Sequence, residues 1–122
     1  SWAAFTAGAK AEVMVMGDLV LFEDEVNPVM SAALDAGLTV TALHNHFFFD
    51  QPRVYFMHIG GEGSLELMAQ GVRAALARQK EIRAANPKPA NFFGSAFAPE
   101  RNVISGATVE SALGVKGQAN NG

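Results

Sequence analysis

Hydrophobic and polar residues alternate with a period of two along residues 12–22, EVMVMGDLVLF. The apolar residues of one face are Val13, Val15, Leu19 and Leu21, and the opposite face carries Glu12, Met14, Met16 and Asp18. Successive side chains of a β-strand point to opposite faces of its sheet. The pattern therefore predicts a strand with one clearly apolar face.

The spacing changes to that of a helix in residues 23–38, EDEVNPVMSAALDAGL. Apolar residues recur at the spacing of a helical stripe, at Val26, Val29, Met30, Ala33 and Leu34. Pro28 lacks an N–H group and suits the first helical turn, and Gly37 suits the position just beyond the last turn. We expect a helix that starts near the acidic residues 23–25, where negative charge is favourable, and stops at Gly37.

A hairpin and a second helix are predicted next. Residues 38–49, LTVTALHNHFFF, are rich in β-branched and aromatic residues, and residues 53–59, RVYFMHI, form the returning strand after a short turn. Residues 60–63, GGEG, are expected to be a flexible connection. Ser64 then caps a long helix that should end before Pro87.

The regular spacing ends after residue 86. Residues 86–102, NPKPANFFGSAFAPERN, combine prolines with Phe92, Phe93 and Phe97, and predict a loop that is ordered through contacts covering these rings. A short helix is expected at about residues 106–113. We therefore divide the chain into a core domain, residues 1–86, and a second segment, residues 87–122, with the loop and the short helix.

The order of elements, strand–helix–strand–strand–helix, predicts an α+β fold. Its sheet would be antiparallel or mixed and backed by the helices. Three strands are few for a stable sheet. We therefore expect a fourth strand from another segment of the chain or from another subunit.

Composition narrows the classes of function. At 122 residues, with 49% hydrophobic and 17% charged residues, the chain has the size and apolar content of one folded domain. A formal net charge of −3 without a cluster of basic residues argues against a nucleic-acid partner. The absence of cysteine excludes disulfides and thiolate metal sites within these residues. No apolar run approaches the roughly 20 residues of a membrane-spanning helix.

The three histidines of the chain all lie in the predicted hairpin, at His44, His46 and His58. His44 and His46 share one face of a strand, with Cα atoms about 6.5–7 Å apart. If Phe49 opposes Arg53 across the turn, His44 lies opposite His58 and all three imidazoles project from the same face. A slip of one residue would move His58 to the other face.

Both faces of the predicted hairpin are substantially apolar, so we expect both to be covered. Dry surroundings favour neutral imidazole, the form that binds metals. Three histidines with one open position are typical of catalytic zinc, and imidazole also suits copper. The carboxylates proposed as a further ligand are Glu25 and Glu62, with Glu23 and Asp18 also considered.

Three functions follow as alternatives. The first is a domain that binds a transition-metal ion, zinc or copper, through His44, His46 and His58, in binding or sensing rather than turnover. The second is a zinc-dependent hydrolase with an open metal position, in which Glu25 or Glu62 is the general base. The third is a non-catalytic assembly module with structural histidines, packed against a second copy of the domain or within a homo-oligomer.

The combination of GDLVL, EDEVNPVM and ALHNH within residues 1–80 resembles the bacterial LppY/LpqO family. The resemblance implies an uncharacterised, exported protein, periplasmic or secreted, with a lipid anchor as an option in the full-length protein. It also implies paired copies of this unit. Residues 104–122 resemble the start of such a unit, so the chain would be one unit and a truncated second one. The resemblance supplies no catalytic residue.

Overall fold

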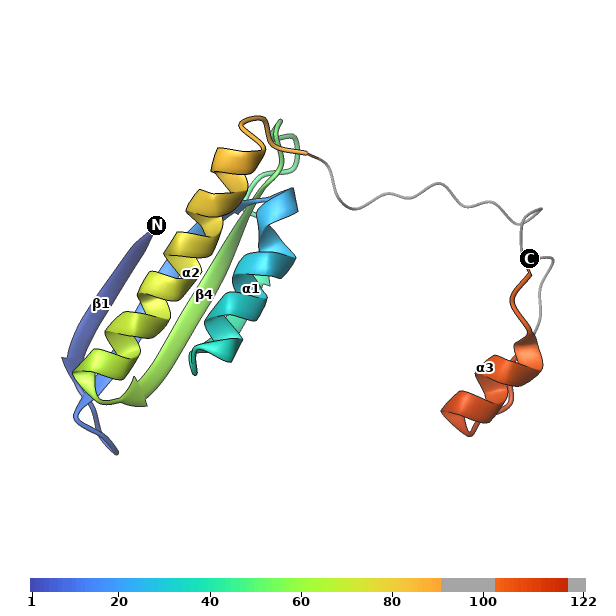
Figure 1. The fold of residues 1–122 in the computed structure, drawn as a ribbon, viewed down its shortest axis with the longest axis horizontal. Helices are drawn as coiled ribbons and strands as arrows, with labels where there is room; N and C mark the ends of the chain where they lie inside the picture. The colour runs from blue at the N-terminus through green and yellow to red at the C-terminus, as the bar shows by residue number, and fades with distance from the viewer. Residues whose placement is uncertain (91–102, 119–122) are drawn as a thin grey trace.

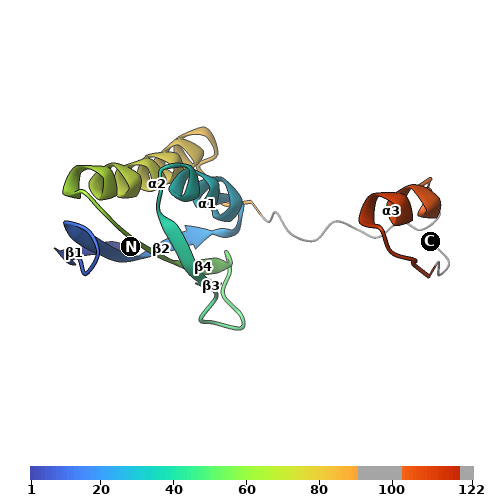
Figure 2. The same cartoon turned by 90° about the horizontal axis from the view of Figure 1, so that it is seen from below.

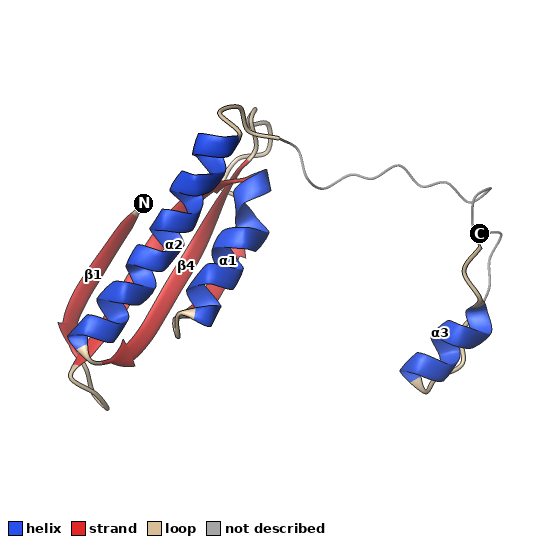
Figure 3. Ribbon diagram, viewed as in Figure 1, coloured by secondary structure: helices blue, strands red, loops and turns tan. Residues whose placement is uncertain are grey.

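Four antiparallel strands form one sheet in the computed structural model, which describes residues 1–90 and 103–118. In their order across the sheet, the strands are β1 (Trp2–Ala7), β2 (Val13–Phe22), β4 (Val54–Gly63) and β3 (Thr39–His44). Figure 3 distinguishes these strands from the helices that accompany them. The predicted α+β class is confirmed, and the sheet is antiparallel rather than mixed.

Two helices cover one face of this sheet. The 3-10 helix η1 (Glu23–Glu25) leads into α1 (Val26–Asp35), and α2 (Leu65–Ala85) follows β4. Figures 1 and 2 show α1 and α2 side by side on the same face. The helix boundaries agree with the sequence. Gly37 has a positive φ just beyond α1, and the Ser64 hydroxyl accepts a hydrogen bond from the Leu67 N–H at the start of α2.

The core lies between the helices and the sheet. Its buried residues come from alternate positions of the strands and from the inner stripes of both helices, and include Val15, Leu19, Leu21, Val29, Ala33, Met57, Ile59, Met68 and Ala75. Burying one such large aliphatic side chain contributes about 1.5–3 kcal/mol. The period of two in β2 therefore arises because alternate side chains are buried against the helices, as the sequence predicted.

The expected fourth strand comes from another segment of the same chain. Residues 2–7 form β1, which pairs with β2 from Trp2 opposite Asp18 to Ala7 opposite Val13. A strand was not predicted for these residues from the sequence. Their side chains are mostly exposed, so they lack the alternation that marks β2.

A flexible connection was expected at residues 60–63. These residues instead form the last part of β4 and pair with residues 13–16 of β2. The glycines allow α2 to approach the sheet closely. A Cβ atom at Gly61 would lie 2.9 Å from the Met68 sulfur, and one at Gly63 would lie 3.1 Å from the Met68 methyl group. Close packing of Met68 thus explains glycine in a strand, where its intrinsic preference is low.

The segment beyond α2 is described in part. Helix α3 (Gly106–Leu113) has the predicted bounds, with Gly114 in the left-handed conformation after it, and none of its residues is buried. The predicted loop with Phe92, Phe93 and Phe97 lies outside the described residues. Within residues 1–90 and 103–118, no helix is long and apolar enough to cross a membrane.

Candidate functional site

The histidines lie on the face of the sheet opposite α1 and α2. This face is open in the described part of the chain: the His58 side chain is 43% exposed, and Trp2 and Met16 are about half exposed. No helix or strand within residues 1–90 and 103–118 covers this face, so the expected covering is not found in this part of the chain. The two helices form a single layer, and the loop that joins β3 to β4 extends to the open side (Figure 2).

The hairpin register differs from the predicted one by two residues. His44 pairs with Phe56, and Ala42 pairs with His58. Because side chains alternate with a period of two, this shift keeps His44 and His58 on one face. Strand β3 ends at His44 rather than Phe49, and residues 45–53 form a longer loop than the predicted turn.

An irregularity in β3 changes the register once more, farther from the turn than His44. The register changes between Val40 and Ala42, so Thr41 is an extra residue in the manner of a β-bulge. Val40 consequently packs against the core, whereas uninterrupted alternation along β3 would place it on the face of His44.

Two histidines and one carboxylate meet at the centre of the open face. The Nε2 atoms of His44 and His58 are 3.2 Å apart. Asp18 pairs with His58 across β2 and β4, and its Oδ2 atom lies 3.7 Å from His58 Nε2. The other carboxylate oxygen, Oδ1, is shielded from solvent and has no hydrogen-bond partner among the residues that the structure describes. Three adjacent strands thus bring three metal-ligating groups together.

His46 occupies a different position from the one predicted. Its ring stacks on Phe56 with centroids 3.9 Å apart, and on His44 at 4.7 Å. It lies just beyond the end of β3 and is exposed. In this arrangement His46 supports the His44 ring rather than facing the His44–His58 contact.

The distances can be compared with those of a metal centre. Two Zn–N bonds of about 2.0–2.1 Å at a tetrahedral angle separate the nitrogens by about 3.3–3.4 Å, close to the observed contact. The Asp18 oxygen is about 0.3 Å farther from His58 Nε2 than a Zn–O bond of about 2.0–2.2 Å would place it. Among residues 1–90 and 103–118, no group of three or more His, Cys, Asp or Glu side chains is placed so that it could hold a metal ion as it stands. The His44–His58 contact has the spacing of two ligands of one ion, and the Asp18 carboxylate lies beside His58 at a somewhat longer distance.

Glu62 is not brought to the histidines. It lies on the same strand as His58, four residues further on, which is about 13 Å at the rise of a β-strand. It pairs with Met14, and its carboxylate accepts a hydrogen bond from the Lys10 N–H at 3.0 Å. The proposed role of Glu62 as a ligand or base therefore has no support in the geometry.

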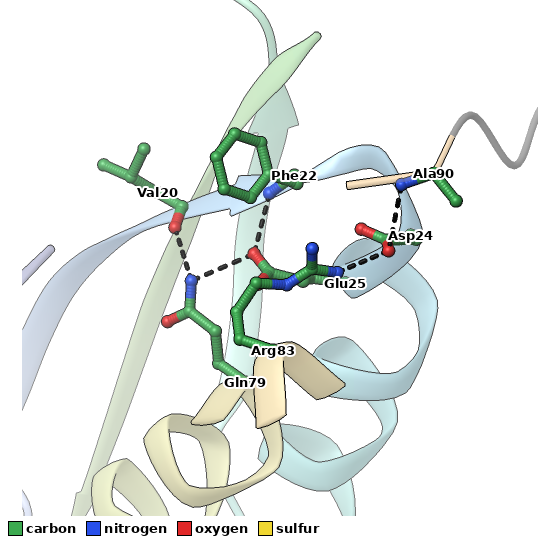
Figure 4. Close-up of polar contacts among 7 residues, drawn as sticks. All are labelled: Val20, Phe22, Asp24, Glu25, Gln79, Arg83 and Ala90. Carbon is green, nitrogen blue, oxygen red and sulfur yellow. Dashed lines mark hydrogen bonds and ion pairs between the residues drawn. The ribbon is translucent and has the colours of Figure 1, made fainter. Parts of the chain in front are cut away.

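Glu25 is engaged on the helix side of the sheet. It is fully buried, and its Oε1 atom lies 2.7 Å from Arg83 Nε. Its Oε2 atom accepts hydrogen bonds from the Phe22 N–H at 2.8 Å and from the Gln79 amide at 3.0 Å. Figure 4 shows these contacts. Glu23, the neighbouring candidate, is also buried.

The contacts around Arg83 and Gln79 connect the end of α2 with the start of α1. Arg83 also pairs with Asp24, whose carboxylate accepts the Ala90 N–H at 3.2 Å, and Gln79 donates to the Val20 carbonyl at 2.8 Å (Figure 4). The acidic run at residues 23–25 thus serves tertiary ion pairing as well as the helix start. Sequence reasoning missed this because Arg83 carries no local sign of its partner.

A cavity of about 280 Å³ adjoins the Asp18–His58 contact. Trp2 and Met16 line its sides together with Thr41, and Gly60 contributes no side chain to it. The sequence analysis did not predict this cavity, because it depends on the pairing of β1 with β2. The open face therefore combines ligating groups with an adjoining apolar space.

These features define a small α+β domain with a helical layer on one face and a histidine–carboxylate cluster on the other. The chain belongs to the family described as Domain of Unknown Function (DUF1259), whose model matches residues 1–78. That range contains the whole sheet and the cluster of Asp18, His44 and His58. No curated protein and no solved structure matches the chain.

The buried ion pair yields a first prediction. Arg83→Met leaves the Glu25 carboxylate buried without its cation, and should lower the free energy of unfolding by about 3 kcal/mol, as measured by urea denaturation. Arg78→Met is the matched control: it removes an exposed pair with Glu81 and should change stability by less than about 0.5 kcal/mol. Adding Glu25→Gln to Arg83→Met should restore part of the loss. Equal effects of the two arginine variants would contradict this account.

Proposed function

We propose that this domain binds a transition-metal ion through His44 and His58, with Asp18 as the third ligand. The observation that carries the proposal is the 3.2 Å contact between the two Nε2 atoms, with the Asp18 carboxylate beside it. Two imidazoles and one carboxylate form the donor set of several catalytic zinc sites and of non-haem iron(II) sites. Zinc is the probe ion of choice, with copper as a second.

The electrostatics of the cluster favour a cation at this point. His58 Nε2 lies close to both the His44 nitrogen and the Asp18 oxygen, but it carries at most one proton and can donate it to only one of them. A metal ion between these groups would interact with the lone pairs of all three at once. The shielded Asp18 Oδ1 atom would at the same time lie next to a positive charge.

The geometry supports binding or sensing better than hydrolysis. The general bases named for a zinc hydrolase were Glu25 and Glu62. Glu25 is held by Arg83 and Gln79 on the other side of the sheet, and Glu62 lies along β4 beyond the cluster. Export, to the periplasm or the medium, is part of the proposal on the strength of the LppY/LpqO resemblance alone.

A second candidate function, assembly with another copy of the domain, is favoured by the tip of the hairpin. Phe47, Phe48 and Phe49 are 60%, 94% and 93% exposed, respectively. They adjoin the open face, where Val20 and Met16 are also exposed. An apolar patch of this kind is typical of a surface that becomes covered.

The metal proposal predicts the effect of single substitutions on zinc affinity. In tag-free protein, His44→Ala and His58→Ala should each weaken zinc binding by more than about 100-fold, since loss of an outer-shell partner alone costs about 10–100-fold. Asp18→Asn should weaken it by about 10-fold. Isothermal titration calorimetry measures these constants. Zinc at 100 times its Kd should add about 2.7 kcal/mol to the stability of the wild type.

His46→Ala is the matched control, because it removes a histidine of the same loop that stacks on Phe56 instead of facing the cluster. Its zinc affinity should fall far less than that of His44→Ala or His58→Ala, by less than about 10-fold, since only a ring that stacks on His44 is lost. Zinc binding that survives in the His44→Ala, His58→Ala double variant would refute the proposed site.

Trp2, the single tryptophan, provides an independent optical test. It lies directly across from Asp18 in the β1–β2 ladder, and both residues line the same cavity. Cu²⁺ at the cluster should quench the indole fluorescence, whereas the closed-shell Zn²⁺ should not. Prior loading with zinc should delay the quenching by copper. Quenching that is unchanged in His44→Ala would assign it to another copper site.

The assembly candidate is tested by mass in solution. Light scattering should give a dimer for the wild type and a monomer for Phe48→Asp with Phe49→Asp. Leu67→Asp is the control, because it places the same charge on a half-exposed leucine of α2. A wild-type protein that is monomeric at all concentrations would contradict assembly through the tip.

A further inference from the structure

We propose that the cavity beside the cluster is the ligand subsite of the metal centre, and that it accepts a small carboxylic acid with an apolar ring and a hydrogen-bond donor next to the carboxylate. This inference rests on the proposed metal site. It names the chemistry that the open coordination positions and the adjoining cavity recognise together.

The cavity has two chemically distinct ends. Asp18 and His58 form the polar end, where the metal would be held, and the indole of Trp2 and the thioether of Met16 form the apolar part. Its volume of about 280 Å³ lies at the lower limit of ligand pockets, about 300 Å³ and above, so the ligand must be small. An aromatic ring against Trp2 and Met16 matches these walls.

Gly60 provides the space. It pairs with Met16 in the β2–β4 ladder, on the open face of the sheet. A Cβ atom here would meet the Val15 carbonyl oxygen at 3.6 Å and the Thr41 methyl group at 3.7 Å, which are ordinary contacts. Packing therefore does not require glycine at this position, in contrast to Gly61, where a Cβ atom would collide with Met68. The consequence of glycine at position 60 is the cavity itself.

Charge at the polar end determines the reactive group of the ligand. A divalent ion with two neutral imidazoles and one carboxylate retains one positive charge. Three protein ligands also leave coordination positions open, so an anionic oxygen donor is preferred. The ligand carboxylate would occupy such a position.

The Asp18 side chain adds a second requirement. Its Oδ1 atom is shielded from solvent and accepts no hydrogen bond, although Oδ2 faces His58. A buried acceptor without a partner is costly, and a hydroxyl group next to the ligand carboxylate would satisfy it once Asp18 turns toward the metal and exposes this oxygen to the cavity. An α-hydroxy acid with an aromatic ring combines all three features.

Mandelate is therefore the probe, with phenylacetate and lactate as analogues that lack the hydroxyl group and the ring, respectively. Calorimetry on tag-free, zinc-loaded protein should show mandelate binding at least about tenfold more tightly than either analogue, because each missing group forfeits a contact of about 1–2 kcal/mol. Binding of mandelate should require zinc.

The decisive variant is Gly60→Val, which fills the cavity with a residue that suits a β-strand. It should retain zinc affinity and lose mandelate binding. Thr6→Ile adds comparable bulk on β1, outside the cavity, and should change neither. Trp2→Ala offers a second route: it removes the indole wall and should weaken mandelate about tenfold while zinc affinity is unchanged.

The outcomes separate the subsite from the metal site. Zinc bound by the wild type, with mandelate equally tight in Gly60→Val or Trp2→Ala, would overturn the subsite and leave the metal proposal intact. Failure of the wild type to bind zinc would overturn both. If Gly60→Val does not fold, the Trp2→Ala result decides.

Discussion

The pairing of β2 with β4 is the interaction on which both faces of this domain depend. Residues 13–22 oppose residues 54–63 without interruption, in antiparallel register. One set of alternate side chains, with Leu19 and Met57, meets the helices, and the other set places Asp18 beside His58. A slip of one residue in this ladder would move every side chain of one strand to the opposite face. Both the core and the contact between Asp18 and His58 would then be lost.

The two outer strands, β1 and β3, each add a different feature to the open face beside this ladder. On one side, β1 brings Trp2 next to Asp18 and forms a wall of the cavity. On the other, β3 brings His44 to within 3.2 Å of His58, even though these two residues are not direct partners across the ladder. The extra residue at Thr41 is what allows β3 to contribute Val40 to the core and His44 to the open face.

Patterns within one element were predictable from the sequence, and arrangements between distant elements were not. The alternation in β2 and the caps of α1 and α2 are local, so they could be identified. The shared face of His44 and His58 was also predicted. This prediction holds although the predicted register is wrong, because a shift of two residues leaves each side chain on the same face. Residues 60–63 were misassigned because their conformation depends on Met68, and Glu25 because its partner Arg83 lies on another helix. Whether the histidine face is covered could not be predicted, because sequence composition does not reveal where helices are placed.

The polar cluster at the end of α2 determines where this domain stops. The family match ends at residue 78, one position before Gln79 and well before Arg83 and Ala90, all of which bind the acidic run at residues 24–25 directly. A domain boundary drawn from sequence similarity would thus cut through the last turns of α2 and expose a carboxylate that the fold has enclosed. The contacts with the acidic run extend to Arg83 in α2 and, through one exposed hydrogen bond, to the Ala90 N–H beyond Pro87 and Pro89.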